Sequence, residues 1–371
     1  MQSIESALGE SVDIKPKSVL HILSSLNIGG AERFVIDLAI EQRQSLKLNS
    51  AILSFGEQDD VLVAECIKNN IPVHFVEGSR SEKIQTFKRV INEFDILHFH
   101  SPFTLLFTCY SPMLCRRKTV VYTRHGAEPF NQLKWRVMHK ITQFIVNQIT
   151  FVSNEGQAVF GKVNNWQNKP QSVVDNGILI PQENHQKPLN EQQAKIKLGS
   201  VARMVPLKNQ ICLLRAVALM PEALANKFEI HFFGDGPCEE LLKSAAAESN
   251  LSKNVHFHGM LVDRENIYKH IDVMVVTSEM EGLSIAILEA MARHIPVLAT
   301  HVGGNPKLVQ SDVTGQLFNY DDDTELSRLL TEIAEAPKLI EKWGNEAYQL
   351  VLQNYSLETV AQKYMKLYLA D

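Results

Sequence analysis

Two glutamates, Glu281 and Glu289, stand on either side of the start of a predicted helix in the second half of the chain. An apolar strand predicted over residues 273–277 leads into this turn, and the helix is predicted over residues 284–294. The first amides of such a helix point outward and favour an anion such as phosphate; here they belong to Gly282, Leu283 and Ser284. Glu289 lies about a turn and a half into the helix, so the two carboxylates would contact different ends of one phosphate-bearing ligand.

This spacing suits a nucleoside diphosphate sugar, with Glu281 facing the sugar and Glu289 facing the ribose hydroxyls. The spacing alone is equally compatible with an ordinary loop acid and a solvated helix position. Other residues at the same edge of the fold must therefore decide between the two interpretations.

Two cations five residues apart, Arg203 and Lys208, follow a strand predicted over residues 196–202 and precede a helix. In an open α/β sheet, ligands bind at the carboxyl ends of the strands, which is where these cations and the two glutamates would meet. A guanidinium and an ammonium there would neutralise a diphosphate leaving group. Two further strands end in loops that contain Gly234 and Met260, and the backbone of these loops would contact a nucleobase.

The 371 residues are enough for two domains of ordinary size, and 45% hydrophobic with 21% charged residues is typical of globular proteins. No apolar run is long enough for a membrane span, and residues 1–17 form a polar tail without a secretory core. We therefore expect a cytoplasmic protein. The five cysteines are scattered and form no C-x-x-C pair, which argues against a disulfide framework and against a zinc site.

Short apolar strands alternate with helical patterns twice, which predicts an α/β fold of two units with parallel sheets. We expect an N-terminal domain over 18–185, a second domain over 186–355 and a final helix over 356–371. The chain is expected to be helical after Asp323. The predicted strands are 19–26, 50–55, 73–76, 96–100, 119–123, 150–152, 173–174, 196–202, 229–233, 255–258, 273–276 and 297–300.

The first predicted strand-to-helix turn contains Gly29 and Gly30. A dinucleotide-binding oxidoreductase requires G-x-G-x-x-G at this position, with an acid about twenty residues later. The adjacent glycines permit close approach of a ligand, but their spacing does not encode binding of a dinucleotide.

The segment 116–140 is strongly basic: residues 101–150 contain seven Lys or Arg and one acid, Glu128. Apolar residues lie beside its cations at helical spacing, which predicts a helix. This helix would be able to lie on anionic lipid headgroups. The alternative, which the pattern favours, is an apolar stripe facing the core with a solvated basic side. No aromatic platform or nucleic-acid motif accompanies the patch, so nucleic acid is not an expected partner. The apolar residues are Trp135, Met138, Ile141 and Ile145.

Nearly end to end, the chain resembles the retaining glycosyltransferases of family 4, which have the two-domain GT-B fold. The motifs that carry the resemblance are residues 29–32, 95–101, 123–126, 175–178, Arg203 with Lys208, 234–237, and Glu281 through Glu289. The resemblance implies two Rossmann-like domains facing each other across a cleft, and a C-terminal helix that crosses back to the first domain.

The resemblance also implies roles for individual residues. Arg203 and Lys208 would hold the donor diphosphate, Glu281 the transferred sugar and Glu289 the ribose, while Gly30 would line the pocket from the opposite domain. Such enzymes usually work without a metal, so we expect no cofactor. The sequence Asp321-Asp322-Asp323 formally matches a metal-binding D-x-D, but it opens a helix and is expected to cap it.

The resemblance places His125, at the end of a first-domain strand, on the acceptor side of the cleft. A histidine there would hydrogen bond the sugar or assist the acceptor hydroxyl, with both protonation states accessible near neutral pH. His100 is the rival candidate. One departure from the family is Lys307, which stands where a glutamate often follows Gly-Gly-x-Pro.

We therefore expect a retaining transferase that moves a hexose or N-acetylhexosamine from a nucleoside diphosphate sugar, with uridine as the default base. The acceptor would be a glycan or a lipid-linked glycan in cell-surface polysaccharide synthesis. A sugar-nucleotide epimerase of the same fold and a non-catalytic subunit that binds a sugar nucleotide are the alternatives.

Overall fold

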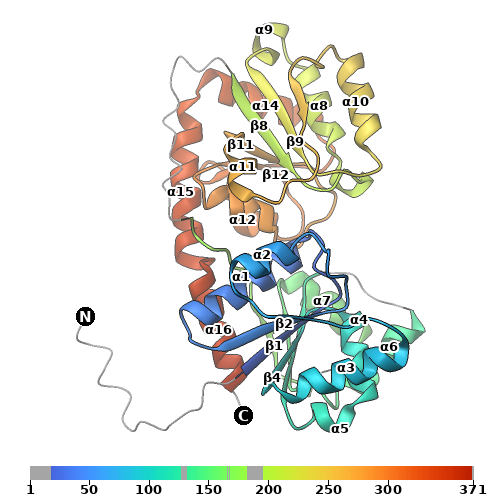
Figure 1. The fold of residues 1–371 in the computed structure, drawn as a ribbon. Helices are drawn as coiled ribbons and strands as arrows, with labels where there is room; N and C mark the ends of the chain where they lie inside the picture. Colours follow the sequence, from blue (N-terminus) through green and yellow to red (C-terminus); the bar gives the residue numbers. More distant parts are fainter. Residues whose placement is uncertain (1–17, 127–131, 165, 167, 182–194, 370–371) are drawn as a thin grey trace, which may run out of the picture.

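The computed structural model describes residues 18–126, 132–164, 166, 168–181 and 195–369. The predicted tail 1–17 and the predicted domain boundary at 185/186 lie outside these residues. Within them the chain forms two parallel sheets, each covered by helices on both faces (Figure 1).

The first sheet has seven strands in the order β3-β2-β1-β4-β5-β6-β7, all of them parallel. Its central strands are buried on both faces, as their nearly continuous apolar sequences predict. The strands are β1 (Ser18–Leu23), β2 (Asn49–Ser54), β3 (Val73–Phe75), β4 (Ile96–Phe99), β5 (Thr119–Arg124), β6 (Gln148–Phe151) and β7 (Gln171–Val173).

The helices of this first domain pack against two separate core clusters, one on each face of the sheet. Helix α1 and the C-terminal helix α16 (Leu357–Leu369) belong to one cluster, and residues of α3 and of the 3-10 helix η2 belong to the other. The helices are α1 (Gly30–Gln44), α2 (Val63–Lys68), α3 (Arg80–Asn92), α4 (Pro102–Leu105), η2 (Leu106–Tyr110), α5 (Pro112–Cys115), α6 (Leu133–Thr142) and α7 (Asn154–Val163).

The second sheet has six parallel strands in the order β10-β9-β8-β11-β12-β13. The strands are β8 (Ile196–Val201), β9 (Phe228–Phe233), β10 (Val255–Phe257), β11 (Val273–Val276), β12 (Val297–Thr300) and β13 (Gly315–Phe318). The helices that cover the sheet are η3 (Pro206–Lys208), α8 (Ile211–Ala218), α9 (Glu222–Ala225), α10 (Glu239–Glu248), α11 (Arg264–Tyr268), α12 (Ile285–Met291), α13 (Asn305–Leu308) and α14 (Asp323–Glu335).

The last two helices join the domains. Helix α15 (Lys338–Asn354) packs on the second domain, and α16 (Leu357–Leu369) packs into the core of the first (Figure 1). Between α15 and α16 the chain runs beside Ile178, which follows the last strand of the first domain. The Ile178 amide donates to the Tyr355 carbonyl, and the Leu357 amide donates to the Ile178 carbonyl. The predicted return of the C-terminal helix to the first domain is confirmed.

Every predicted strand corresponds to an observed one, and the largest shift of an end is three residues, at the carboxyl end of β1. Strand β13 was not predicted, because its sequence Gly-Gln-Leu-Phe contains no β-branched residue. None of the described helices combines the length and the apolar character needed to cross a bilayer.

Candidate active site in the cleft between the two sheets

A cleft of about 850 Å³ lies between the carboxyl ends of the two sheets. Its walls are loops that follow β1 and β5 in the first domain and β8, β9 and β11 in the second. All the predicted site residues line this cleft: Gly29, Gly30, His125, Arg203, Lys208, Gly234, Met260, Glu281, Gly282, Leu283, Ser284 and Glu289.

Lys208 and Glu281 form the closest charged pair in the cleft, with 2.6 Å between Lys208 Nζ and Glu281 Oε1. The Ser278 hydroxyl donates to the same carboxylate oxygen at 2.7 Å. Two further bonds hold the loops together: the Thr277 hydroxyl donates to the Lys208 carbonyl, and the Glu279 amide to the Leu207 carbonyl. The loop after β8 and the loop after β11 therefore present their charges as one unit.

Arg203 lies in the same loop as Lys208 and is exposed to the cleft. Its backbone carbonyl accepts a hydrogen bond from the Gln210 side chain at 3.0 Å, which fixes the start of the loop. Across the described residues, no carboxylate forms an ion pair with its guanidinium. The charge of Arg203 is therefore not neutralised by a carboxylate among the described residues, whereas Lys208 shares its charge with Glu281.

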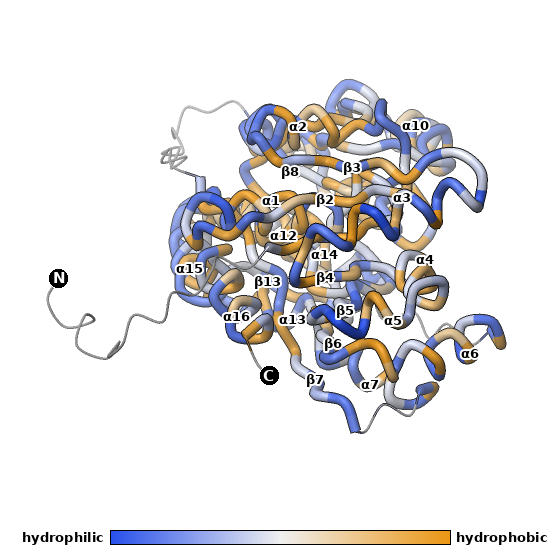
Figure 2. The backbone as a smooth tube through the Cα atoms, turned by 60° about the horizontal axis from the view of Figure 1, so that its bottom comes forward, coloured by the Kyte–Doolittle hydropathy of each residue, from blue (hydrophilic) through white to orange (hydrophobic). Residues whose placement is uncertain are grey.

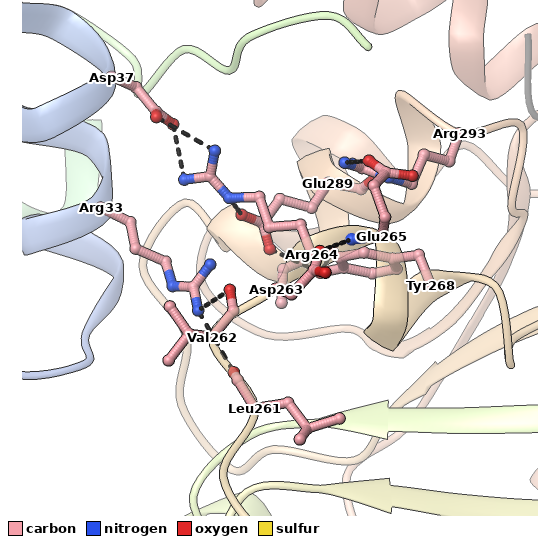
Figure 3. Close-up of polar contacts among 11 residues, drawn as sticks. Arg33, Asp37, Leu261, Val262, Asp263, Arg264, Glu265, Tyr268, Glu289 and Arg293 are labelled. Atoms are coloured by element: carbon pink, nitrogen blue, oxygen red, sulfur yellow. Dashed lines mark hydrogen bonds and ion pairs between the residues drawn. The ribbon is translucent and has the colours of Figure 1, made fainter. Parts of the chain in front are cut away.

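Glu289 is only 5% exposed and is held by two side chains from α11 (Figure 3). Arg264 Nε lies 2.7 Å from Glu289 Oε1, and the Tyr268 hydroxyl donates to Oε2 at 2.7 Å. Burial, together with the Glu289 charge and hydrogen bond, raises the pKa of Tyr268 well above its usual value, so the phenol remains a donor. The carboxylate that was expected to contact ribose is thus oriented before any ligand arrives.

The same Arg264 connects Glu289 to the first domain (Figure 3). Its two terminal nitrogens donate to both carboxylate oxygens of Asp37, on α1, at 3.1 and 2.8 Å. Burial raises the pKa of Asp37 to about 6, although the charge of Arg264 opposes this shift. Arg264 is itself largely buried, yet Asp37 and Glu289 hold its pKa above the usual value. One guanidinium thus bridges an acid from each domain.

Two other contacts bring the domains together beside this bridge. The Arg33 guanidinium donates to the Val262 carbonyl at 3.0 Å and to the Leu261 carbonyl at 3.4 Å. At the mouth of the cleft, a Cβ atom placed on Gly30 would lie 3.4 Å from Cγ1 of Ile285. This is an ordinary van der Waals distance, so the start of α1 lies close to the start of α12.

His125 ends a row of buried histidines that starts deep in the first domain. Its Nε2 lies 3.0 Å from His100 Nδ1, His100 Nε2 lies 3.0 Å from His21 Nδ1, and His21 Nε2 lies 2.9 Å from Gln42 Oε1. Because the Gln42 oxygen can only accept, His21 donates from Nε2, and each neutral ring along the row then donates to the next. This order leaves His125 with a proton on Nε2 and a free lone pair on Nδ1, for which the described residues provide no hydrogen-bond partner.

Burial lowers the pKa of His125 to about 4, so the ring is neutral at pH 7. The expectation that both protonation states would be accessible near neutral pH is therefore wrong, because desolvation disfavours the cation. The rival candidate, His100, lies behind His125 and is not among the residues that line the cleft. His21, His98 and His100 are close enough together to suggest a metal site, but the hydrogen bonds described above already use the nitrogens of His21 and His100.

The Asp321-Asp322-Asp323 sequence has a structural role. Asp322 caps α14 by accepting from the Glu325 amide at 2.9 Å, as predicted, and its two neighbours pair with Arg215. Lys307, the departure from the family pattern, lies 2.5 Å from an oxygen of Asp175 and so pairs across the two domains.

Family models match both halves of the chain. The model for glycosyltransferase family 4 matches residues 28–179, and the model for glycosyl transferases group 1 matches residues 181–350. The chain belongs to glycosyltransferase family 4. As a family 4 glycosyltransferase it has the GT-B fold, which the solved structures of similar proteins bear out.

Two relatives and one structure illustrate the similarity. The chain is 24% identical to the UDP-Gal:alpha-D-GlcNAc-diphosphoundecaprenol alpha-1,3-galactosyltransferase of Escherichia coli over 75% of this chain and 76% of that protein. It is 24% identical to the capsular polysaccharide biosynthesis glycosyltransferase CapH of Staphylococcus aureus, over 79% and 83%. The crystal structure of Anabaena HepE in complex with UDP-glucose superposes with a TM-score of 0.80 at 20% identity, over 95% and 99%.

Asp37, Arg264 and Tyr268 of this family 4 chain were not predicted from the sequence. Asp37 and Arg264 are separated by 227 residues and meet only because α1 packs against the second domain. No local pattern distinguishes either of them from an ordinary helix residue.

Proposed function

We propose that this glycosyltransferase moves a hexose or N-acetylhexosamine from a UDP-linked sugar to a glycan or lipid-linked acceptor, with retention of the anomeric configuration. The observation that carries the proposal is the convergence of Arg203, Lys208, Glu281 and Glu289 on one cleft. The printed names of the relatives support a role in cell-surface polysaccharide synthesis, since one acts on a diphosphoundecaprenol-linked sugar and another in capsule synthesis. The UDP-glucose complex of HepE supports the class of donor.

The charges in the cleft suit a diphosphate next to a sugar. Arg203 and Lys208 both follow β8, at the rim where the leaving diphosphate would collect negative charge. Because Lys208 also binds Glu281, the phosphate end and the sugar end of the donor would meet at this ion pair. These two cations would supply charge stabilisation of the kind that metal ions supply in other transferases, so the proposed reaction requires no cofactor.

In the proposed reaction, the bond between the anomeric carbon and the diphosphate oxygen breaks while the acceptor oxygen bonds to the same face of that carbon. The acceptor proton passes to the departing phosphate oxygen, and UDP leaves. No side chain acts as nucleophile, which agrees with the environment of Glu281. Its carboxylate is already engaged by Lys208 and Ser278 and is suited to hold the sugar hydroxyls.

His125 would act as a neutral hydrogen-bonding group. With its proton directed to His100, its Nδ1 lone pair would accept a hydrogen bond from a hydroxyl of the sugar or the acceptor. A pKa of about 4 fits this role and not that of a general acid at neutral pH.

The basic segment 116–140 would bring the enzyme to an anionic membrane, where a lipid-linked acceptor would be found. Met138 and Ile145 face the core, which matches the core-facing stripe that the sequence favoured, whereas Ile141 of that stripe is 49% exposed. Helix α6 lies at an outer edge of the molecule (Figure 2). A second row of apolar side chains, on α6 and just after it, is exposed: Leu133, Val137, Ile141 and Phe144. Exposed apolar residues beside Lys134, Arg136 and Lys140 have the composition of an interfacial helix.

Sedimentation with vesicles tests this membrane contact. We expect binding to vesicles that contain phosphatidylglycerol and little binding to phosphatidylcholine alone, with Phe144→Ser weakening the binding. Equal binding to both vesicles, or no loss in Phe144→Ser, would contradict the contact.

Incubation with a panel of nucleotide sugars, with and without glycan acceptors, tests the reaction. Sugar transfer that requires an acceptor, with the anomeric configuration of donor and product equal by NMR, is the expected result. Isomerisation of the donor without acceptor would instead indicate an epimerase, and binding without turnover would indicate a non-catalytic subunit.

A further inference from the structure

A second group of titratable side chains lies outside the cleft, on the face of the second sheet opposite α8 and α10. Along β9, Phe228, Ile230 and Phe232 enter the core that contains those helices, so Glu229 and His231 point to the other face. His256 of β10 pairs directly with His231 in the sheet register, which places the two imidazoles side by side with ring centroids 4.8 Å apart. We call Glu229, His231 and His256 the β9–β10 cluster.

Each of the three members of the cluster offers one ligand atom, and these three atoms all lie within 4.8 Å of one another. His231 is 5% exposed, yet its Nε2 has no hydrogen-bond partner in the described part of the chain, and neither does Nε2 of His256. A carboxylate oxygen of Glu229 lies 3.7 Å from His231 Nε2. Buried polar atoms without partners are uncommon, so two of them beside a carboxylate call for an explanation.

We propose that Glu229, His231 and His256 bind a divalent transition metal of the zinc type. Two imidazole nitrogens and one carboxylate are a familiar ligand set for zinc, with a water molecule in the fourth position. Ligand atoms of a tetrahedral zinc site are about 3.3 Å apart, given bonds of about 2.0–2.2 Å. Small side-chain rotations would bring the cluster to that spacing.

His258, which directly follows β10, supports this assignment. Its Nε2 lies 2.9 Å from His231 Nδ1, so His231 can donate from Nδ1 to His258 and keep its Nε2 lone pair for the metal. A ligand histidine is usually oriented by such a partner on its other nitrogen.

The proposed site is distinct from the donor site. None of the three ligands lines the cleft. The strands that carry them nevertheless lead to it, because Gly234 follows β9, and its amide donates to the carbonyl of Gly259, which follows His258, at 2.8 Å. A bound metal would fix β9 against the edge strand β10 and thereby stabilise these two loops. The role is structural and leaves the chemistry of sugar transfer to the cleft.

The test is calorimetric titration of Zn²⁺ into untagged, chelator-treated, full-length protein. We expect one bound ion per chain, a rise in melting temperature on binding, and a cobalt derivative with the intense visible absorption of tetrahedral coordination. His256→Ala and Glu229→Gln should each weaken binding at least tenfold, and His258→Phe by about 10–100-fold, as is typical for partners of ligand histidines. The control His301→Ala removes an exposed histidine of the same domain and should bind zinc as the wild type does.

Two results would overturn the proposal: no zinc binding by the wild type at about 100 µM, or equal affinity in the wild type, His256→Ala and Glu229→Gln. Melting curves of the metal-free variants show whether a lost affinity reflects a lost fold. Should His256→Ala fail to fold, Glu229→Gln and the cobalt spectrum decide the question, since neither requires removal of an imidazole.

Discussion

Replacing Arg264 by methionine removes the guanidinium that joins Asp37 of the first domain to Glu289 of the second, while keeping a side chain of similar length. Both carboxylates are buried, at 2% and 5% exposure, and would then face each other's charge without a cation. Breaking a buried ion pair from one side typically costs about 3–5 kcal/mol. We expect a loss of unfolding free energy in this range at about pH 7.5.

The loss of unfolding free energy in Arg264→Met should depend on pH, and the pKa of Asp37 determines whether it grows or shrinks as the pH rises. The folded-state pKa of Asp37 in the wild type, about 6, is above its value of 3.8 in the absence of the protein environment. Without Arg264 the pKa rises further, so between about pH 6 and 7.5 the wild type gives up a proton that the variant keeps. For one proton, the unfolding free energy of the variant falls relative to that of the wild type by about 1.36 kcal/mol per pH unit, which gives ~2 kcal/mol over one and a half units. Arg264→Met should therefore be more destabilising at pH 7.5 than at pH 5, by about this amount.

Urea unfolding at the two pH values measures both quantities, with Arg328→Met as the matched control. Arg328 pairs with Glu325 and Glu332 on the exposed face of α14, where its side chain is 59% accessible, so its loss should cost less than about 1 kcal/mol. Equal losses in Arg264→Met and Arg328→Met, or a loss from Arg264→Met that is the same at both pH values, would refute the reasoning.

Four other variants test separate parts of the site. Lys208→Ala and Glu281→Ala should each lower turnover by ~10²-fold or more with an unchanged melting temperature, and wild-type rates in both would contradict their assignment. His100→Phe should lower turnover about 5–10-fold at constant donor KM, in line with one lost hydrogen bond to His125; a change in KM alone would argue against positioning. Gly234→Ala should cost ~1–3 kcal/mol of unfolding free energy, because φ is +127° and the new Cβ would lie 2.2 Å from the Ala202 carbonyl oxygen.

The sheets could be predicted because their strands are short apolar runs buried on both faces, a pattern that the sequence shows directly. Among the described strands, the unpredicted strand β13 has β12 as its one neighbour, at the edge of the sheet, and that pairing requires glycine at 315: a Cβ there would lie 1.9 Å from the Val297 carbonyl oxygen. Such a strand is specified by its neighbour more than by its own residues.

The cleft residues that directly follow strands could be predicted from the sequence, because a parallel sheet brings the loops after its strands to one edge. The sequence did not indicate side chains that meet through packing between domains, such as Asp37 and Arg264. The β9–β10 cluster was missed for a related reason. The scattered cysteines of the sequence argue against a zinc site, whereas His231 and His256 become neighbours only through the strand register.

A crystal structure of the protein with a UDP-sugar bound tests the central claim most directly. The account predicts diphosphate oxygens within hydrogen-bond distance of Arg203 and Lys208, the transferred sugar against Glu281 and the ribose hydroxyls at Glu289. A donor bound outside the cleft between the two sheets, or bound inside it with these four side chains turned away, would contradict the account.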